Sequence, residues 1–108
     1  MKHNIVRREF IFAPETPAYR SVHASTIAAH GGILAAAWFG GSGEGKNDVR
    51  IWTSLRAANG WSEPVPASPD DGEPHWNPVL YSDGESLTLW YKTGSSPRPY
   101  CLREPRPE

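Results

Sequence analysis

Two extended segments separated by a polar loop form the clearest pattern along the chain. In residues 48–54 (DVRIWTS), β-branched side chains alternate with arginine, tryptophan and serine, and this period of two predicts a β-strand. Residues 33–39 are continuously apolar and rich in alanine, as in a strand that is buried on both faces. We therefore predict a β-hairpin. Its glycine-rich loop carries two carboxylates, Glu44 and Asp48, and is the first candidate for a site of chemistry.

Further segments have the alternation or the β-branched and aromatic composition of strands. They are residues 5–12, 23–29, 61–65, 76–81 and 86–92. Turn signals separate them, and residues 55–60 are predicted to be a turn. No segment has a helical period of useful length. Short strands at close, regular spacing predict an all-β fold of the sandwich, barrel or propeller type.

A weak internal repeat favours the propeller. Residues 31–39 (GGILAAAWF) and 83–91 (DGESLTLWY) both place glycine before an apolar strand that ends in two aromatic residues. Their separation is close to one propeller blade, which is about 40–50 residues long in repeats of this kind. Residues 54–61 have the frame of an Asp-box, Ser-x-Asp-x-Gly-x-x-Trp, although only the serine and the tryptophan match.

Composition narrows the range of functions. A chain of 108 residues has room for one small domain, and its net charge of -1 gives no sign of a nucleic-acid or anionic-membrane partner. The single cysteine, Cys101, excludes an internal disulfide framework. No apolar run has the length of a signal peptide or a membrane span, so a cytoplasmic location is expected. Five tryptophans and eleven prolines indicate a loop-rich β fold with aromatic surfaces, which often bind sugars.

Several separate strings occur in the order that one protein family has. They are HASTI at 23–27, WFGG at 38–41, Glu44-Gly45, Asp48-Val49, Ile51-Trp52, WNPVL at 76–80 and Tyr91-Lys92-x-Gly94. From about Val22 to Arg98 the chain resembles the predicted-neuraminidase group of the sialidase superfamily, whose members carry BNR (Asp-box) repeats. The resemblance implies a six-bladed β-propeller that acts on glycosides.

The resemblance also implies that this chain corresponds to roughly the first two blades of a longer protein. The divisions expected are an N-terminal closing strand and linker (1–20), a first blade (21–66), an incomplete second blade (67–103) and a tail (104–108). The sequence after Arg98 departs from the family pattern. Such a chain is expected to be inactive alone and to self-associate through the open face of a blade.

Two carboxylates are candidates for the catalytic acid. A glycosidase needs a proton donor at the leaving oxygen, and the resemblance places that donor on the loop that carries Glu44 and Asp48. Asp48 is preferred because it heads a predicted strand and its backbone is more fixed, whereas Glu44 sits among glycines that would let the loop close over a ligand. The structural alternative is that Asp48 caps the hairpin and Glu44 is a solvated loop charge.

Further residues are candidates for substrate binding. They are Arg20, His23, Trp76, Asn77 and Lys92. Sialidases clamp the substrate carboxylate with arginines, because a guanidinium can pair with it bidentately. The resemblance places Ser21 or His23 where the first of these arginines belongs, with Arg20 adjacent, and this is a departure from the family pattern.

The remaining candidates each have a functional and a structural interpretation. His23 suits proton abstraction, as in a polysaccharide lyase, or is a strand histidine bonded to backbone. Trp76 stacks on a sugar or packs between blades, and Asn77 binds sugar hydroxyls. Lys92 reaches an anionic substrate or is solvated. The other tryptophans are assigned to packing: Trp38, Trp52, Trp61 and Trp90.

The sequence therefore predicts the N-terminal part of a sialidase-like glycoside hydrolase with a glycan or glycoside as its partner. The alternatives are a non-catalytic piece of a propeller that binds glycans or proteins, and a lyase-type propeller that uses His23. No cofactor is expected. No metal is expected either, because the histidines lack the short spacing of zinc ligands.

Overall fold

The computed structural model describes residues 7–13, 20–95 and 102–103, and within these residues it contains strands and no helix. The described residues accordingly provide no helix long and apolar enough to cross a membrane. The strands are β1 (Ser21–His30), β2 (Ile33–Gly41), β3 (Arg50–Ala57), β4 (Gly60–Trp61), β5 (Val65–Pro66), β6 (His75–Ser82), β7 (Leu87–Thr93) and β8 (Leu102–Arg103).

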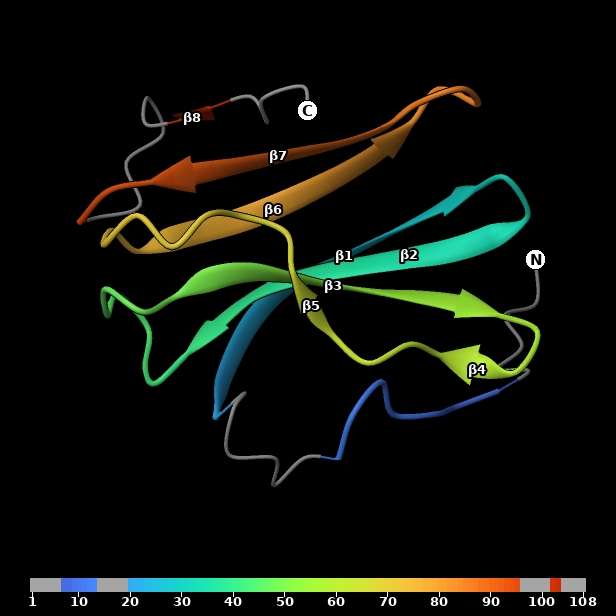
Figure 1. The fold of residues 1–108 in the computed structure, drawn as a ribbon, viewed down its shortest axis with the longest axis horizontal. Helices are drawn as coiled ribbons and strands as arrows, with labels where there is room; N and C mark the ends of the chain where they lie inside the picture. Colours follow the sequence, from blue (N-terminus) through green and yellow to red (C-terminus); the bar gives the residue numbers. More distant parts are fainter. Residues whose placement is uncertain (1–6, 14–19, 96–101, 104–108) are drawn as a thin grey trace, which may run out of the picture.

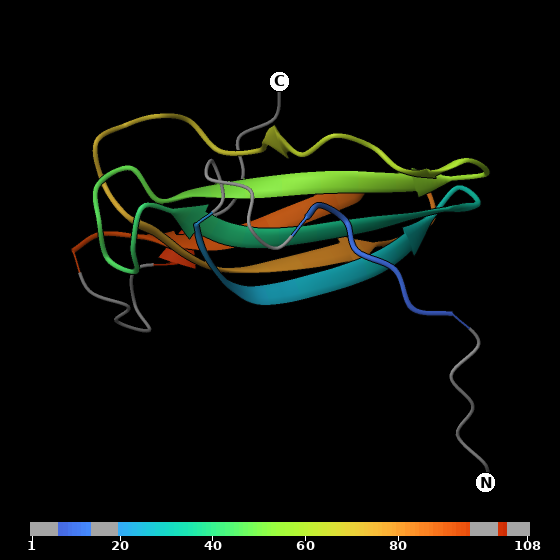
Figure 2. The same cartoon turned by 90° about the horizontal axis from the view of Figure 1, so that it is seen from below.

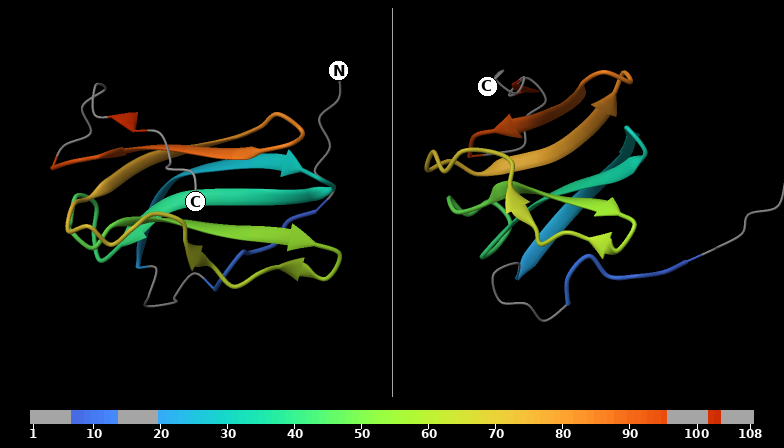
Figure 3. Two further views of the ribbon diagram at one scale, coloured as in Figure 1. Left: turned by 45° about the horizontal axis from the view of Figure 1, so that its top comes forward. Right: turned by 45° about the vertical axis from the view of Figure 1, so that its right-hand side comes forward.

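The strands form two antiparallel sheets, which confirms the all-β prediction. The first sheet has the order β1-β2-β3-β4, with β5 paired to β3, and the second has the order β6-β7-β8 (Figure 1). The second sheet packs on the first through β6, which lies between β7 and the first sheet in both views of Figure 3. Tight turns at residues 31–32 and 83–86 join the strands of the two long hairpins at one end of the molecule.

β2 is covered on both faces, as its continuous apolar run predicts. Ala35, Ala37 and Phe39 face the second sheet and belong to the main core. Trp38 is buried on the opposite face, where Phe12 packs on it with ring centroids 5.6 Å apart. Figure 2 views the molecule from the side on which residues 7–13 cross the first sheet. The alanines let both layers approach the strand closely.

The strands that begin each hairpin, β1 and β6, share an irregularity near their starts. The register shifts between His23 and Thr26 in β1, and between Trp76 and Val79 in β6. Each shift contains a non-glycine residue with positive φ, Ala24 at 56° and Asn77 at 50°. β-bulges of this kind redirect side chains and bend strands. The two hairpins thus repeat a structural feature, in agreement with the sequence repeat.

The prediction of an N-terminal strand over residues 5–12 is wrong for the residues that the structure describes. Residues 7–13 are irregular, and residues 5–6 lie outside the described part. Side chains rather than a backbone ladder hold this segment, since the Arg56 guanidinium pairs with the Glu9 carboxylate and Phe12 packs on the first sheet. The described residues 7–13 therefore pack on the first sheet without adding a strand to it.

Two boundaries in the first sheet also differ from the prediction. β3 runs through Ala57, so the turn predicted over 55–60 contains only Ala58 and Asn59. The single strand predicted over 61–65 is two short ones, β4 and β5, and both pair with β3. Pro64 lies between them and has no N–H to donate, which interrupts the ladder.

Candidate functional site

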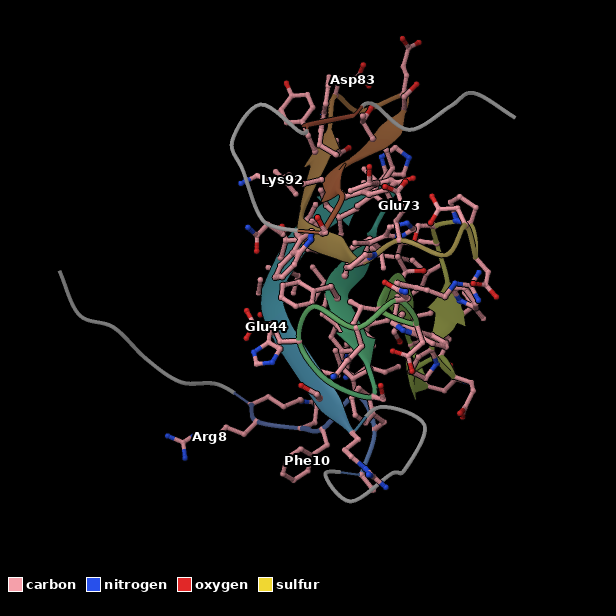
Figure 4. The ribbon with its side chains drawn as sticks, turned by 90° about the vertical axis from the view of Figure 1, so that its left-hand side faces the viewer. Arg8, Phe10, Glu44, Glu73, Asp83 and Lys92 are labelled. Carbon is pink, nitrogen blue, oxygen red and sulfur yellow. The ribbon has the colours of Figure 1, made fainter. Side chains whose placement is uncertain are left out.

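The loop of residues 42–49 projects from the end of the molecule at which β1 and β6 begin (Figure 1). Two turns fold it, because Lys46 N donates to Gly43 O at 3.1 Å and Val49 N donates to Lys46 O at 3.1 Å. The side chain of Glu44 leaves the loop toward β1, and its Oε1 lies 4.0 Å from His23 Nε2. Glu44 and Lys92 project from the same side of the molecule in Figure 4. The loop thus brings a carboxylate to the first candidate histidine.

His23 is held by side chains rather than by backbone. Its Nε2 lies 3.0 Å from Ser21 Oγ, and its ring stacks on Phe39 with centroids 5.3 Å apart and an interplanar angle of 30°. The imidazole remains 42% exposed and the Glu44 side chain 57% exposed. Both groups are therefore accessible to a ligand, and the contacts with Ser21 and Phe39 orient the ring.

Trp76 lies beneath the loop as part of the core. Its ring packs against Phe39 with centroids 5.7 Å apart, and its Nε1 donates to Gly94 O at 2.9 Å. A Cβ added to Gly45 would lie 3.6 Å from the indole, so the loop rests directly on it. Trp76 is only 6% exposed, so its ring packs in the core of this structure. Sugar stacking by this ring stays a prediction.

Asn77 and Lys92 flank Trp76. Asn77 is exposed in its bulge, immediately after the buried indole. Lys92 is the register partner of Trp76 on β7 and is half-buried.

Asp48 does not head a strand, because β3 begins at Arg50. Its carboxylate closes the loop instead. Ser42 N donates to both carboxylate oxygens at 3.2 Å, and Ser42 Oγ donates to Oδ1 at 3.0 Å. The preference for Asp48 as catalytic acid rested on a strand position that the residue does not have, and its oxygens are engaged within the loop.

Arg20 shares a cleft of about 530 Å³ with Asp48, and the lining of this cleft includes neither Glu44 nor His23. Its lining residues are Arg20, Gly41, Ser42, Asp48, Arg50, Trp52 and Asp70. The Arg50 guanidinium is committed elsewhere, since its Nε and Nη2 donate to Ser68 O at 3.3 and 2.8 Å. Arg20 is the exposed cation of this cleft. Within residues 7–13 and 20–95, no three His, Cys, Asp or Glu side chains gather as metal ligands would.

Comparison with known proteins identifies the family. The profile of the BNR repeat-like domain matches residues 32–100, which is more than half of the chain. The chain belongs to this family. No curated protein and no solved structure matched it. The matched part of the BNR repeat-like domain contains Glu44, Asp48, Trp76, Asn77 and Lys92, whereas Arg20 and His23 precede it.

The degenerate Asp-box of this BNR repeat-like domain lies at the turn from β3 to β4. Ser54 Oγ donates to Ser62 O at 2.6 Å, and Ser62 N donates to Leu55 O at 2.8 Å. Ser62 Oγ in turn accepts from Leu55 N at 3.0 Å. Serine contacts hold the turn although the aspartate and glycine of the motif are absent. The predicted placement of the box between the third and fourth strands of the first sheet is confirmed.

A buried polar chain in the BNR repeat-like domain escaped the sequence analysis. Ser68 Oγ lies 2.6 Å from His75 Nδ1, and His75 Nε2 lies 2.9 Å from Asp71 Oδ1. Ser68 Oγ also accepts from Ile51 N at 2.9 Å. The only sequence signal is the spacing of four residues between an aspartate and a histidine that precedes a strand. Nothing in the sequence points to Ser68.

Asp71 should make the stability of the domain sensitive to acid. Burial alone would raise the pKa of Asp71, but the Glu73 backbone N–H and the His75 ring outweigh burial and hold it below its ordinary 3.8. Such a carboxyl group stabilises the fold above its unfolded-state pKa, and this contribution is lost as the pH falls through the lower folded-state value. As the pH is lowered below 3.8, the urea midpoint of unfolding should therefore fall more steeply for the wild type than for Asp71→Asn. Parallel curves for the two proteins would contradict this assignment.

Proposed function

We propose that this chain carries part of a carbohydrate-binding site of a sialidase-like β-propeller, in which Glu44 acts as the acid at a glycosidic bond. The observation that carries the proposal is the approach of the Glu44 carboxylate to within 4.0 Å of His23 Nε2, across the start of β1. Membership of the BNR repeat-like family supports it, since such repeats are typical of sialidase-like propeller proteins.

The roles follow from the contacts. Glycoside hydrolysis needs a proton donor that can reach the leaving oxygen, and Glu44 is exposed on a glycine-rich loop. His23, oriented by Ser21 and Phe39, hydrogen-bonds the ligand or exchanges a proton with Glu44. The exposed amide of Asn77 binds sugar hydroxyls. Asp48 fixes the loop through Ser42 and keeps Glu44 near β1.

Cations near the loop suit an acidic sugar. Arg20 is exposed in the cleft beside Asp48, and Lys92 projects on the same side as Glu44 (Figure 4). A guanidinium pairs with a carboxylate more strongly than an ammonium does. We therefore propose Arg20 as the first partner of a substrate carboxylate, with Lys92 as a second positive charge.

Titration of the chain with sugars tests the proposal. Sialyllactose, an oligogalacturonate and neutral lactose are added separately to ¹⁵N-labelled protein. The proposal expects an acidic sugar to move the resonances of Glu44, His23 and Asn77 more than lactose does. Absence of any shift at these residues at millimolar sugar would overturn it. Binding without turnover of a fluorogenic glycoside would identify a glycan-binding piece rather than a catalytic one.

Glu44→Gln should weaken this binding about tenfold or more, because a hydrogen bond to a charged group is worth roughly 1.5–3 kcal/mol. Glu85→Gln is the matched control. It removes an exposed carboxylate from the turn at the other end of the strands (Figure 1). Dissociation constants from the same titrations measure the effect. Equal affinities for the two variants would remove Glu44 from the site.

A lyase remains the second candidate function, and the accessibility of His23 favours it. Its imidazole is 42% exposed, and a neutral imidazole is a suitable base for elimination from a uronic acid. An elimination product carries a new carbon–carbon double bond and absorbs ultraviolet light, whereas a hydrolysis product does not. Incubation with polygalacturonate, followed by ultraviolet absorbance, separates the two reactions.

A further inference from the structure

The hydrogen-bonded chain of Ser68, His75 and Asp71 lies where the second sheet meets the first. His75 is fully buried, and Ser68 is 5% exposed. The His75 ring packs against Tyr91 with centroids 5.2 Å apart, and its backbone N donates to Val49 O at 3.2 Å. This chain therefore links β3, the connection that follows β5, and the first residue of β6.

The directions of the hydrogen bonds follow from the carboxylate end of the chain. The Asp71 carboxylate can only accept, so His75 Nε2 carries a proton and donates it. In a neutral ring Nδ1 then has no proton and accepts from the Ser68 hydroxyl. Ser68 Oγ also accepts from Ile51 N–H, and Asp71 Oδ1 also accepts from Glu73 N–H at 3.2 Å.

The arrangement looks like a Ser-His-Asp catalytic triad but is not built for attack. Ser68 is enclosed, and its oxygen already accepts from the Ile51 amide. Its backbone is also fixed, because Arg50 donates to Ser68 O through two nitrogens. A nucleophile must be reachable by a substrate. The chain therefore holds position rather than forming a covalent bond.

We infer that Ser68, His75 and Asp71 are positioning residues that lock His75 in its Nε2–H tautomer. They thereby fix Trp76 against the loop, and with it the position of the next residue, Asn77. His75 immediately precedes Trp76, whose ring supports Gly45 one residue after Glu44. A polar network in which every member is satisfied specifies one geometry, whereas loss of one member leaves its neighbour without one of its hydrogen bonds. Only the role of Asn77 in binding rests on the proposed function; the lock itself does not.

The tautomer is tested on the sugar-free chain by long-range ¹H–¹⁵N correlation at neutral pH. His75 should show a protonated Nε2 and an unprotonated Nδ1. The opposite tautomer, or two protonated nitrogens, would overturn the inference. Asp71→Asn keeps an oxygen that accepts from Nε2–H, so it should retain the tautomer. Asp71→Ala should lose it, and retention in both variants would remove Asp71 from the lock.

A pair of serine variants separates positioning from stability. Ser68→Ala removes a buried hydroxyl that accepts a hydrogen bond from β3, and Ser54→Ala removes a buried hydroxyl that lies on β3 itself. Ser54 bonds to Ser62 beside β4, away from β6. Both variants should lower the urea midpoint. Only Ser68→Ala should also shift the Trp76 indole N–H and the Asn77 amide resonances.

Equal shifts of these two resonances in both serine variants would overturn the positioning role. If Ser68→Ala does not fold, Asp71→Ala replaces it in the same comparison with Ser54→Ala. These readouts need no sugar, so their failure leaves the glycan test untouched. Failure of the glycan test likewise leaves the tautomer assignment standing.

Discussion

Trp76→Ala should lower the free energy of unfolding by about 3–5 kcal/mol, the usual cost of removing a large aromatic side chain from a core. The indole is 6% exposed and packs between Phe39 and the loop at Gly45. Its Nε1 also donates to Gly94 O, so the variant leaves a carbonyl without its donor. A domain of this size has only about 5–15 kcal/mol of stability, so this loss is a large part of the total.

Urea denaturation followed by circular dichroism measures the change. Tyr81→Ala is the control, because Tyr81 lies on the same strand but is 61% exposed and should change the stability by about 0.5 kcal/mol or less. A Trp76→Ala variant as stable as the Tyr81→Ala variant would mean that the indole is not a core element. Sugar stacking would then become the better account of its presence.

The sequence predicts the strands whose environment is simple. Residues 33–39 read as a strand buried on both faces because alanine and aromatic residues fill both sides of β2. In residues 86–92, the alternation of β7 places Leu87, Leu89 and Tyr91 on the core side. Each pattern reflects only which faces of its own strand are buried, so local sequence is enough to predict it.

Segments that depend on distant partners are predicted poorly. Residues 7–13 have the composition of a strand, yet Glu9 and Phe12 find side-chain partners on the first sheet and no ladder forms. β5 pairs with β3 only because the chain crosses back over it after Pro64. Propensity does not report which surface a segment will meet.

The candidate site is also predicted only in part from the sequence. The alternation of polar and apolar residues predicts the hairpin loop that carries Glu44 and Asp48, but it does not predict the different environments of these two carboxylates. Glu44 approaches His23 because β1 and β2 pair in a register that places His23 beside Phe39. Asp48 is drawn to Ser42 by a turn that delays the start of β3. The partners of a loop carboxylate depend on tertiary geometry, which the pattern of a single sequence does not predict.

Gly41→Ala should destabilise the domain by about 1–3 kcal/mol, the range for an extra methyl group in a tightly packed place. A Cβ on Gly41 would lie 2.8 Å from Asp48 Oδ1, 3.0 Å from Val49 Cα and 3.1 Å from Asp48 O. Two of these contacts are with backbone, so the far end of the loop has to move. That movement should also break the hydrogen bonds from Ser42 to Asp48.

Gly43→Ala is the matched control in the same loop. A Cβ there would meet only the Lys46 side chain, with 3.5 Å to Cγ, which is an ordinary contact. Its effect should stay within about 1 kcal/mol, because the methyl group also restricts the unfolded chain. Urea denaturation gives the stability of each variant, and the Ser42 amide resonance reports whether its bond to Asp48 survives. If Gly41→Ala kept both its stability and that resonance, the close approach of β2 to Asp48 and Val49 would be refuted.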